Sequence, residues 1–248
     1  MIPWVTILIL TIAFFAAALL YASVGNAGAS GYLAVMALFN LAPDVMKPTA
    51  LALNILVASI ATLHFYRARC FSWQVFWPFA LTSIPFSYLG GRVLLPAEIY
   101  QPLVGIVLFY VAYRLFRSAS KGLPAAGKRS MPVGLALGAG AMIGFLAGLI
   151  GLGGGIFLTP LLLFTGWAEL RQAAGVSAVF NLVNSLAGLT GQLTILGVLP
   201  GAIVPWAIAA GIGGWIGAMY GSRRLENARL QQALGVVLLV AGLKIVLD

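Results

Sequence analysis

The sequence predicts an all-α integral membrane protein built from two inverted repeats, each with a re-entrant or broken helical hairpin followed by three transmembrane helices. Three observations predict this fold: the composition, a series of long apolar segments and a weak internal repeat. Of the 248 residues, 62% are hydrophobic and only 8% are charged, whereas soluble domains carry roughly 25% charged residues. The composition therefore excludes an ordinary soluble domain and indicates a multi-pass membrane protein.

Eight apolar segments follow one another along the chain. A helix needs about 20 apolar residues to cross the hydrocarbon core of a bilayer. The first segment contains no Lys or Arg before its apolar run, so it is interpreted as a membrane segment and not as a cleavable signal peptide. The segments lie near residues 3–22, 49–66, 74–93, 99–117, 132–150, 173–193, 200–220 and 231–247.

The second half of the chain repeats the pattern of the first. Residues 24–29 align with residues 150–155 at an offset of 126, and Asn54 aligns with Asn181 one residue out of step. The stretch 118–131, SASKGLPAAGKRSM, is the one linker with loop composition. We therefore divide the chain into a first membrane repeat (1–117), a cytoplasmic linker (118–131) and a second membrane repeat (132–248).

Each repeat contains a short apolar run after a cluster of small residues. The runs are Gly31 to Leu41 and Pro160 to Trp167. Ten helical residues rise roughly 15 Å, about half a bilayer, so these runs are predicted to be half-helices. Ser30 is the expected N-cap of the first, and Thr159 with Pro160 is expected to cap and open the second.

The distribution of Lys and Arg predicts the topology. If all eight segments span the membrane, the basic residues divide eight against six, which favours neither orientation. If each repeat instead begins with a hairpin and the N-terminus lies outside, eleven basic residues are cytoplasmic and three are not: Lys47, Arg92 and Lys244. Three spans per repeat invert the second repeat relative to the first. One alternative stays open, in which the first segment of each repeat spans the membrane and a separate re-entrant loop follows it.

The two breaks predict a binding cavity between the repeats. Irregular backbone at membrane depth must be buried in protein or line a cavity, and amides at the start of a half-helix attract anions. A polar stripe either lines this cavity or joins helices by hydrogen bonds, and it consists of Ser177, Asn181, Asn184, Ser185, Gly188 and Gln192. The candidate substrate-binding residues are Gly25, Asn26, Gly28, Ser30, Asn54, Gly151, Gly153, Gly154, Gly155, Ser177, Asn181 and Asn184.

Several other functions are disfavoured by the residues. The run GLIGLGGGIF at 148–157 lacks the Lys and Ser or Thr of a phosphate loop and follows no strand. The basic residues are scattered, which disfavours nucleic acid binding. A single His, a single Cys and acidic residues confined to segment ends give no metal site, no cofactor and no catalytic residues. The absence of a buried carboxylate suits an anionic substrate.

The chain resembles the sulfite exporter TauE/SafE family, also called the toluene sulfonate uptake permeases. The resemblance rests on Gly151-x-Gly153-Gly154-Gly155-x4-Pro160-x-Leu162 and on its degraded copy Gly25-x-Ala27-Gly28-Ala29. The resemblance implies transport of small sulfur-containing anions such as sulfite, sulfoacetate or another organosulfonate. We therefore expect a secondary transporter of the cell inner membrane that works by alternating access; a small-anion channel is the alternative. A homodimer is compatible with the sequence.

Overall fold

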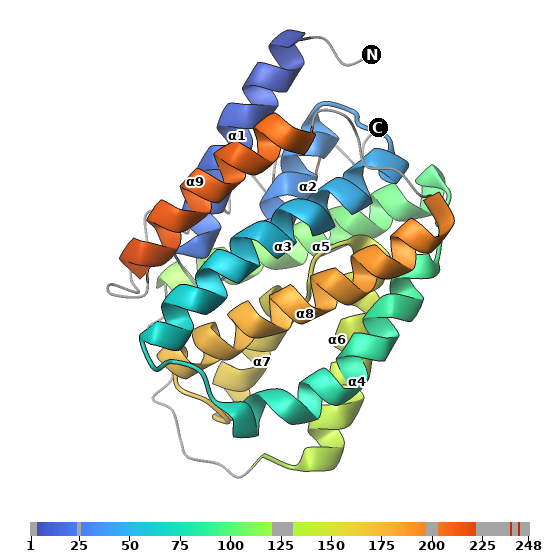
Figure 1. Cartoon of the computed structure of the whole chain (residues 1–248). Helices are drawn as coiled ribbons and strands as arrows, with labels where there is room; N and C mark the ends of the chain where they lie inside the picture. Colours follow the sequence, from blue (N-terminus) through green and yellow to red (C-terminus); the bar gives the residue numbers. More distant parts are fainter. Residues whose placement is uncertain are drawn as a thin grey trace.

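The computed structural model describes residues 4–23, 26–120, 131–196 and 203–221, together with residues 239 and 243. Within these ranges the secondary structure is helical and no strand occurs, which confirms the all-α class (Figure 1). Nine helices lie in the described ranges: α1 (Trp4–Ala22), α2 (Ala29–Leu38), α3 (Pro43–Arg67), α4 (Trp73–Arg92), α5 (Ala97–Ser120), α6 (Val133–Ile150), α7 (Gly155–Thr165), α8 (Leu170–Leu196) and α9 (Ile203–Gly221).

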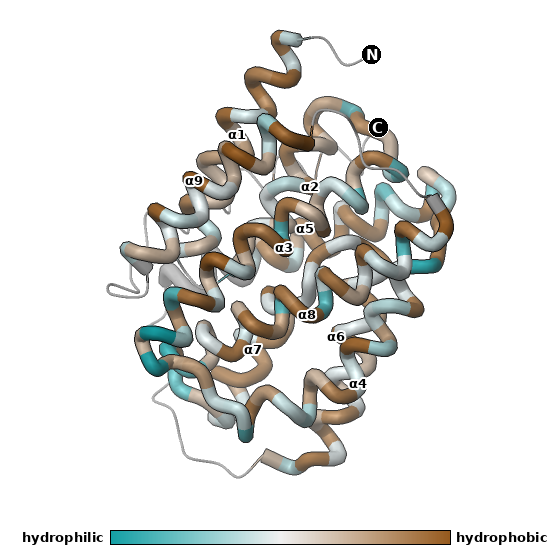
Figure 2. The backbone as a smooth tube through the Cα atoms, in the orientation of Figure 1, coloured by the Kyte–Doolittle hydropathy of each residue, from teal (hydrophilic) through white to brown (hydrophobic). Residues whose placement is uncertain are grey.

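The helices follow the predicted apolar segments, and the last predicted segment, 231–247, lies outside the described ranges. Five helices are long and apolar enough to cross a membrane: α1, α3, α6, α8 and α9. Helices α2 and α7 are shorter apolar helices of 10 and 11 residues, as expected for half-helices. Figure 2 shows hydrophobic residues along α1 and α9 and a hydrophilic stretch where α3 leads into α4.

The predicted offset of 126 residues is present in the backbone around the two breaks. Gly28 precedes α2 with φ 95°, and Gly154 precedes α7 with φ 88°. Both angles lie in the left-handed region, which glycine adopts without a steric penalty. Before each break, an amide bonds to the carbonyl five residues earlier: Asn26 N to Tyr21 O and Leu152 N to Ala147 O, both at 3.0 Å. The two breaks therefore share one backbone design.

The predicted N-caps are wrong at both half-helices. Ser30 is the second residue of α2, because the left-handed Gly28 allows the helix to begin at Ala29. Helix α7 begins at Gly155, so Thr159 and Pro160 lie one turn inside it. Pro160 removes the amide that would bond to the carbonyl of residue 156. The hydroxyl of Thr159 donates back to the Gly155 carbonyl at 3.0 Å and caps nothing.

The helices of the two repeats are exchanged in the packing. Helix α1 of the first repeat packs along α9 of the second, and α6 of the second packs along α4 of the first (Figure 1). Gly213 approaches the backbone of Phe15, and Gly140 and Gly144 approach the backbone of α4 at Phe79 and Ser83, so these glycines serve close helix packing. Because α3 also packs on α8, the main pairings of the long helices correspond when the repeats are interchanged.

This exchange gives the protein two hydrophobic cores, which we call lobe 1 and lobe 2. Lobe 1 takes its buried residues from α1, α2, α3, α5 and α9, with a few from the end of α6 and from α8. Lobe 2 takes them from α4, α6, α7 and α8. Each lobe therefore contains one helix of the other repeat, so the boundary between the lobes does not follow the boundary between the repeats.

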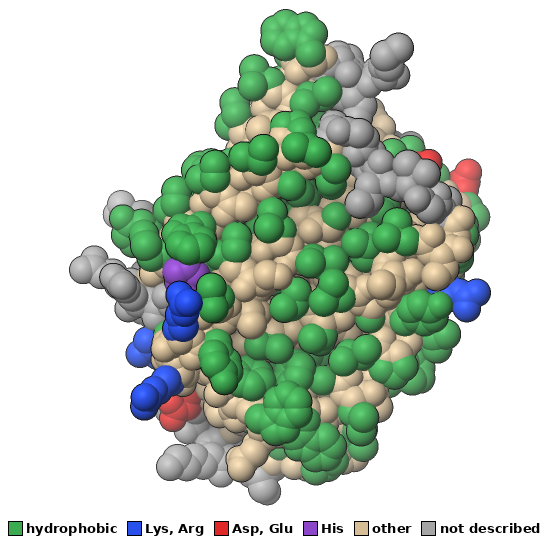
Figure 3. Space-filling model, viewed as in Figure 1, with side chains coloured by type: hydrophobic (Ala, Val, Ile, Leu, Met, Phe, Trp, Pro, Cys, Tyr) green, Lys and Arg blue, Asp and Glu red, His purple; other side chains and the backbone are tan. Residues whose placement is uncertain are grey.

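Charged side chains gather at opposite edges of the molecule. In Figure 3, hydrophobic side chains cover the middle of the visible face, and Lys and Arg side chains lie at its two edges. This distribution suits a bundle whose middle is surrounded by lipid. The orientation of the repeats in the membrane, and the division into 1–117, 118–131 and 132–248, stay predictions.

Candidate functional site

The two breaks meet at one buried cavity. The first repeat contributes Tyr21 of α1, the loop and helix start at 26–30, and Asn54 of α3. The second repeat contributes Leu152, Ile156 of α7 and Asn181 of α8. The cavity measures about 10 Å³, roughly the space that one water molecule requires. This volume is smaller than an oxyanion.

The backbone of the first break is fixed by an aromatic side chain. Tyr32, one turn into α2, folds back so that its hydroxyl donates to the carbonyl of Ala27 at 2.8 Å. A Cβ built on Gly28 would lie 2.9 Å from the Tyr32 ring, so a larger residue at 28 would displace it. Phe14 of α1 packs edge-to-face on the same ring at 5.5 Å. These contacts hold the loop before α2 against α1.

The backbone of the second break is fixed by an asparagine. The amide of Gly155, the first residue of α7, donates to Asn181 Oδ1 at 2.7 Å. The first amides of a helix have no intrahelical acceptor, so Asn181 supplies one from the neighbouring helix. Asn181 was predicted to offer its amide group to a ligand. Its oxygen instead caps the half-helix, although the residue also lines the cavity.

A hydrogen bond between the repeats closes one side of the cavity. Asn54 Nδ2 of α3 donates to Ser185 Oγ of α8 at 2.7 Å, and both residues are buried. Gly153 lies directly against this pair: a Cβ on Gly153 would overlap the Asn54 amide nitrogen and lie 2.7 Å from Ser185 Oγ. Glycine at 153 thus permits the loop between α6 and α7 to approach α3 and α8 closely.

Four polar atoms that line the cavity have no hydrogen-bond partner among the described residues. They are the Tyr21 hydroxyl, Asn26 Oδ1, the Ser30 hydroxyl and Asn54 Oδ1. Leaving one buried polar group unsatisfied costs about 1–3 kcal/mol. A cluster of such groups around one cavity is typical of a site whose ligand completes the hydrogen bonding.

The structure brings some of the predicted site residues together and separates others. Asn26, Gly28, Ser30, Asn54 and Asn181 line the cavity, and Gly153 and Gly155 pack against its asparagines. Gly151 packs on Lys47, and Gly154 packs on Phe180 in lobe 2. Gly25 lies outside the described ranges.

Ser177 and Asn184 of the polar stripe make hydrogen bonds away from the cavity. The hydroxyls of Thr159 and Ser177 share a hydrogen bond at 2.7 Å, which ties α7 to α8. Asn184 Nδ2 donates to the backbone carbonyl of Phe180 in its own helix. The backbone carbonyl of Asn184 accepts a hydrogen bond from the Ser87 hydroxyl of α4 at 2.8 Å. Neither Ser177 nor Asn184 lines the cavity. For Ser177 the structure favours the second of the two predicted roles, hydrogen bonding between helices. The Asn184 side chain bonds within α8, and its backbone carbonyl accepts the bond from α4.

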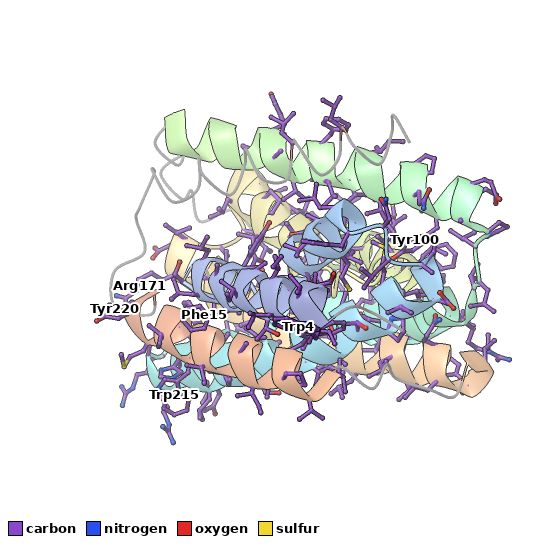
Figure 4. All side chains as sticks on the ribbon, turned by 90° about the horizontal axis from the view of Figure 1, so that it is seen from above. Trp4, Phe15, Tyr100, Arg171, Trp215 and Tyr220 are labelled. Atoms are coloured by element: carbon purple, nitrogen blue, oxygen red, sulfur yellow. The ribbon has the colours of Figure 1, made fainter. Side chains whose placement is uncertain are left out.

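Two residues that support the site were not predicted. Lys47 was counted only as a topology signal, but it is 4% exposed and its Nζ donates to the carbonyls of Gly90, Gly91 and Val93 at 2.9–3.3 Å. Tyr100 points from α5 into the bundle (Figure 4), where its hydroxyl donates to the Ile150 carbonyl at 2.8 Å. A lone lysine and a lone tyrosine within apolar sequence are the signals that could have indicated them.

Comparisons with known proteins agree with these observations. The family model described as "Sulfite exporter TauE/SafE" matches residues 9–245. The "Probable membrane transporter protein y4hK" of Sinorhizobium fredii is 45% identical and covers 95% of this chain and 96% of its own. The "Probable membrane transporter protein YunE" of Bacillus subtilis is 22% identical and covers 84% of this chain and 83% of its own. No solved structure matches the chain.

Proposed function

The chain belongs to the sulfite exporter TauE/SafE family of membrane transporters, and on this premise we propose that it carries a small sulfur-containing anion across the cell inner membrane. Sulfite, sulfoacetate or another organosulfonate are the candidate substrates. The observation that carries the proposal is the meeting of two half-helix starts, one from each repeat, at a single buried cavity. The lipid bilayer and the anion are the partners it requires.

The electrostatics of the cavity support an anionic substrate. Helices α2 and α7 begin at the cavity, and the start of a helix carries a partial positive charge. The residues that line the cavity contain no carboxylate. An anion is therefore attracted by helix ends and hydroxyl groups without a buried cation, and a cation gains no charged partner there.

Alternating access is the mechanism that the packing supports. Because the cavity measures only about 10 Å³, we expect the surrounding helices to separate when the substrate enters. Tyr21, Ser30 and Asn54 stand on helices of lobe 1. Ile156 and Asn181 stand on α7 and α8, which supply the core of lobe 2, although Ile156 and part of α8 also pack against lobe 1. Motion of lobe 1 against lobe 2 would open the cavity, with the Asn54–Ser185 hydrogen bond broken and re-formed in each cycle. The moving units are the lobes and not the sequence repeats.

Flux into liposomes tests the proposal and separates it from the channel alternative. Purified protein in liposomes should take up labelled sulfite at a rate that saturates with concentration and rises when unlabelled sulfite is placed on the opposite side. Acceleration by substrate on the far side is the property of a carrier. A current that follows voltage without saturating would instead indicate a channel, and no flux of any sulfur-containing anion would overturn the proposal.

A thermal-shift screen identifies the substrate independently of flux. A ligand that binds the native state raises the unfolding temperature by mass action. Sulfite and small sulfonates should raise the unfolding temperature of the detergent-solubilised protein more than carboxylates of similar size.

Chromatography with light scattering on the same sample measures whether the chain forms the homodimer that the sequence allows.

A further inference from the structure

The two half-helices differ in how their first amides are satisfied. At α7, the Gly155 amide is occupied by Asn181 Oδ1. Asn54, the residue that matches Asn181 in the first repeat, does not perform this role at α2. Its Nδ2 donates across the lobe boundary to Ser185, and its Oδ1 has no partner among the described residues. The first amide of α7 therefore has an acceptor from the protein, whereas no side-chain acceptor for the first amides of α2 occurs among the described residues.

The unpartnered polar atoms gather at the α2 start. Ser30 stands in the first turn of α2, Tyr21 in the last turn of α1 and Asn54 on α3. All three residues are at least 98% buried and line the cavity. The first intrahelical bond at this end runs from Tyr32 N to Gly28 O, so the amides of residues 29–31 precede it. Ala29 and Ser30, which carry two of these amides, line the cavity.

The unpartnered atoms are of two chemical kinds. The hydroxyls of Tyr21 and Ser30, with the helix amides, can donate hydrogen bonds to anionic oxygens. Asn26 Oδ1 and Asn54 Oδ1 can only accept. A ligand that presents only anionic oxygens would satisfy the donors but would face two carbonyl oxygens with like partial charge. A ligand that also carries an O–H or N–H group would satisfy both kinds.

We infer that the substrate binds at the α2 start, through Tyr21, Ser30 and Asn54, and that it is a small oxyanion bearing its own hydrogen-bond donor. This inference rests on the proposed function and narrows it. Hydrogen sulfite and short hydroxy- or aminosulfonates belong to this class. Fully deprotonated sulfite and sulfoacetate do not. Asn181 is then a positioning residue, because it holds α7 in place and leaves the contact with the anion to the first repeat.

A matched pair of ligands tests the inference. Ethanesulfonate and 2-hydroxyethanesulfonate carry the same anionic group, and only the second has a donor. Calorimetric titration of the full-length protein should show about tenfold tighter binding of 2-hydroxyethanesulfonate. Ser30→Ala removes a donor to the anion and should weaken both ligands by about three- to tenfold. Asn54→Leu removes the acceptor and should bring the ratio of the two affinities close to one.

Thr159→Val supplies the matched control, since Thr159 lies in α7 and bonds to Ser177 outside the cavity lining. It should leave both affinities within twofold of the unaltered protein, and elution as one peak shows that each variant is folded. Equal binding of the two ligands by the unaltered protein would overturn the donor requirement. Unchanged affinities in Ser30→Ala would overturn the placement at α2. Both results can occur while sulfite flux persists, so they are distinguishable from failure of the proposed function.

Discussion

Lys47 Nζ donates to the carbonyl oxygen of Gly91 at 2.9 Å, and the same nitrogen reaches the carbonyls of Gly90 and Val93. Lys47 stands in the first turns of α3, in lobe 1, whereas these carbonyls end α4, which belongs to lobe 2. The last carbonyls of a helix lack intrahelical donors, and a cation there also interacts favourably with the helix dipole. One side chain thus joins the two lobes beside the second break, because Gly151 packs on the same lysine.

Replacing Lys47 by methionine should reduce the stability of the protein. Lys47→Met keeps the aliphatic length but removes three hydrogen bonds, so we expect a loss of about 3 kcal/mol. The measurement is the unfolding midpoint in a denaturant series in detergent. Arg92→Met is the control, because Arg92 is an exposed cation at the same helix end that stacks on Tyr88 at 5.9 Å; it should cost less than 1 kcal/mol. Equal losses would contradict the role of Lys47.

Replacing Asn181 by leucine should show how much the cap on the Gly155 amide contributes to the stability of the protein. Asn181→Leu leaves the Gly155 amide without an acceptor, which costs about 1–2 kcal/mol. Thermal unfolding should therefore begin at a lower temperature. Ser59→Ala is the matched control on α3, because Ser59 is exposed and bonds only to Ile55 of its own helix. An unchanged midpoint in Asn181→Leu would show that the cap contributes nothing.

Alanine at position 153 should disrupt the contact between the repeats. Gly153 has φ 70°, and its added Cβ would overlap the Asn54 amide and crowd Ser185. We expect Gly153→Ala to abolish sulfite flux and to lower the unfolding temperature. Gly138→Ala provides the control on α6, since a Cβ there meets nothing within 4 Å; it should leave flux intact and stabilise the helix by up to about 1 kcal/mol. Normal flux in Gly153→Ala would mean that this close approach is dispensable.

Disulfide links between engineered cysteines should distinguish motion of lobe 1 against lobe 2 from motion within one lobe. Leu51 of α3 and Gly188 of α8 face each other across the lobe boundary, with a built Cβ 3.5 Å from the Leu51 side chain. Leu56 of α3 and Gly211 of α9 face each other within lobe 1, where a Cβ built on Gly211 would lie 3.3 Å from the Leu56 side chain. In a Cys70→Ala background, joining a cysteine pair at 51 and 188 should stop uptake, and reduction should restore it.

Joining the pair at 56 and 211 should leave uptake near its uncrosslinked rate, because both helices belong to one lobe. Mass spectrometry of the linked peptides verifies that each bond has formed. Uptake that continues with the pair at 51 and 188 linked would exclude motion of lobe 1 against lobe 2. Loss of uptake with only the pair at 56 and 211 linked would place the moving boundary inside lobe 1.

The backbone of the breaks was predictable from the sequence, because it depends on local residue types. Clusters of glycine and alanine at an offset of 126 indicate two similar interruptions, and Gly28 and Gly154 have the same left-handed conformation. The N-caps were misplaced because a serine or threonine was expected to begin each helix. Glycine in the left-handed conformation began both helices earlier, and the acceptor for the Gly155 amide came from Asn181, which is distant in sequence.

The roles of the matching asparagines were not predictable, because they depend on which neighbour each one meets. Asn54 and Asn181 occupy similar positions, yet one bonds to Ser185 across the lobes and the other caps a helix. Likewise, burial of Lys47 follows from the approach of α4, which lies more than forty residues away in sequence. Periodicity and spacing describe one segment at a time, and they contain no information about these pairings.

The exchange of helices between the lobes also sets the order in which the protein can be assembled. Helix α1 ends at Ala22, and its packing partner α9 begins only at Ile203. During synthesis, α1 cannot pack on α9 until nearly the whole chain has been inserted into the bilayer, since pairings distant in sequence form late. A chain released after the first repeat would have α1 and α4 without their partners. The fold thereby gives cellular quality control a means to recognise an unfinished transporter, through helix faces that only the second repeat can cover.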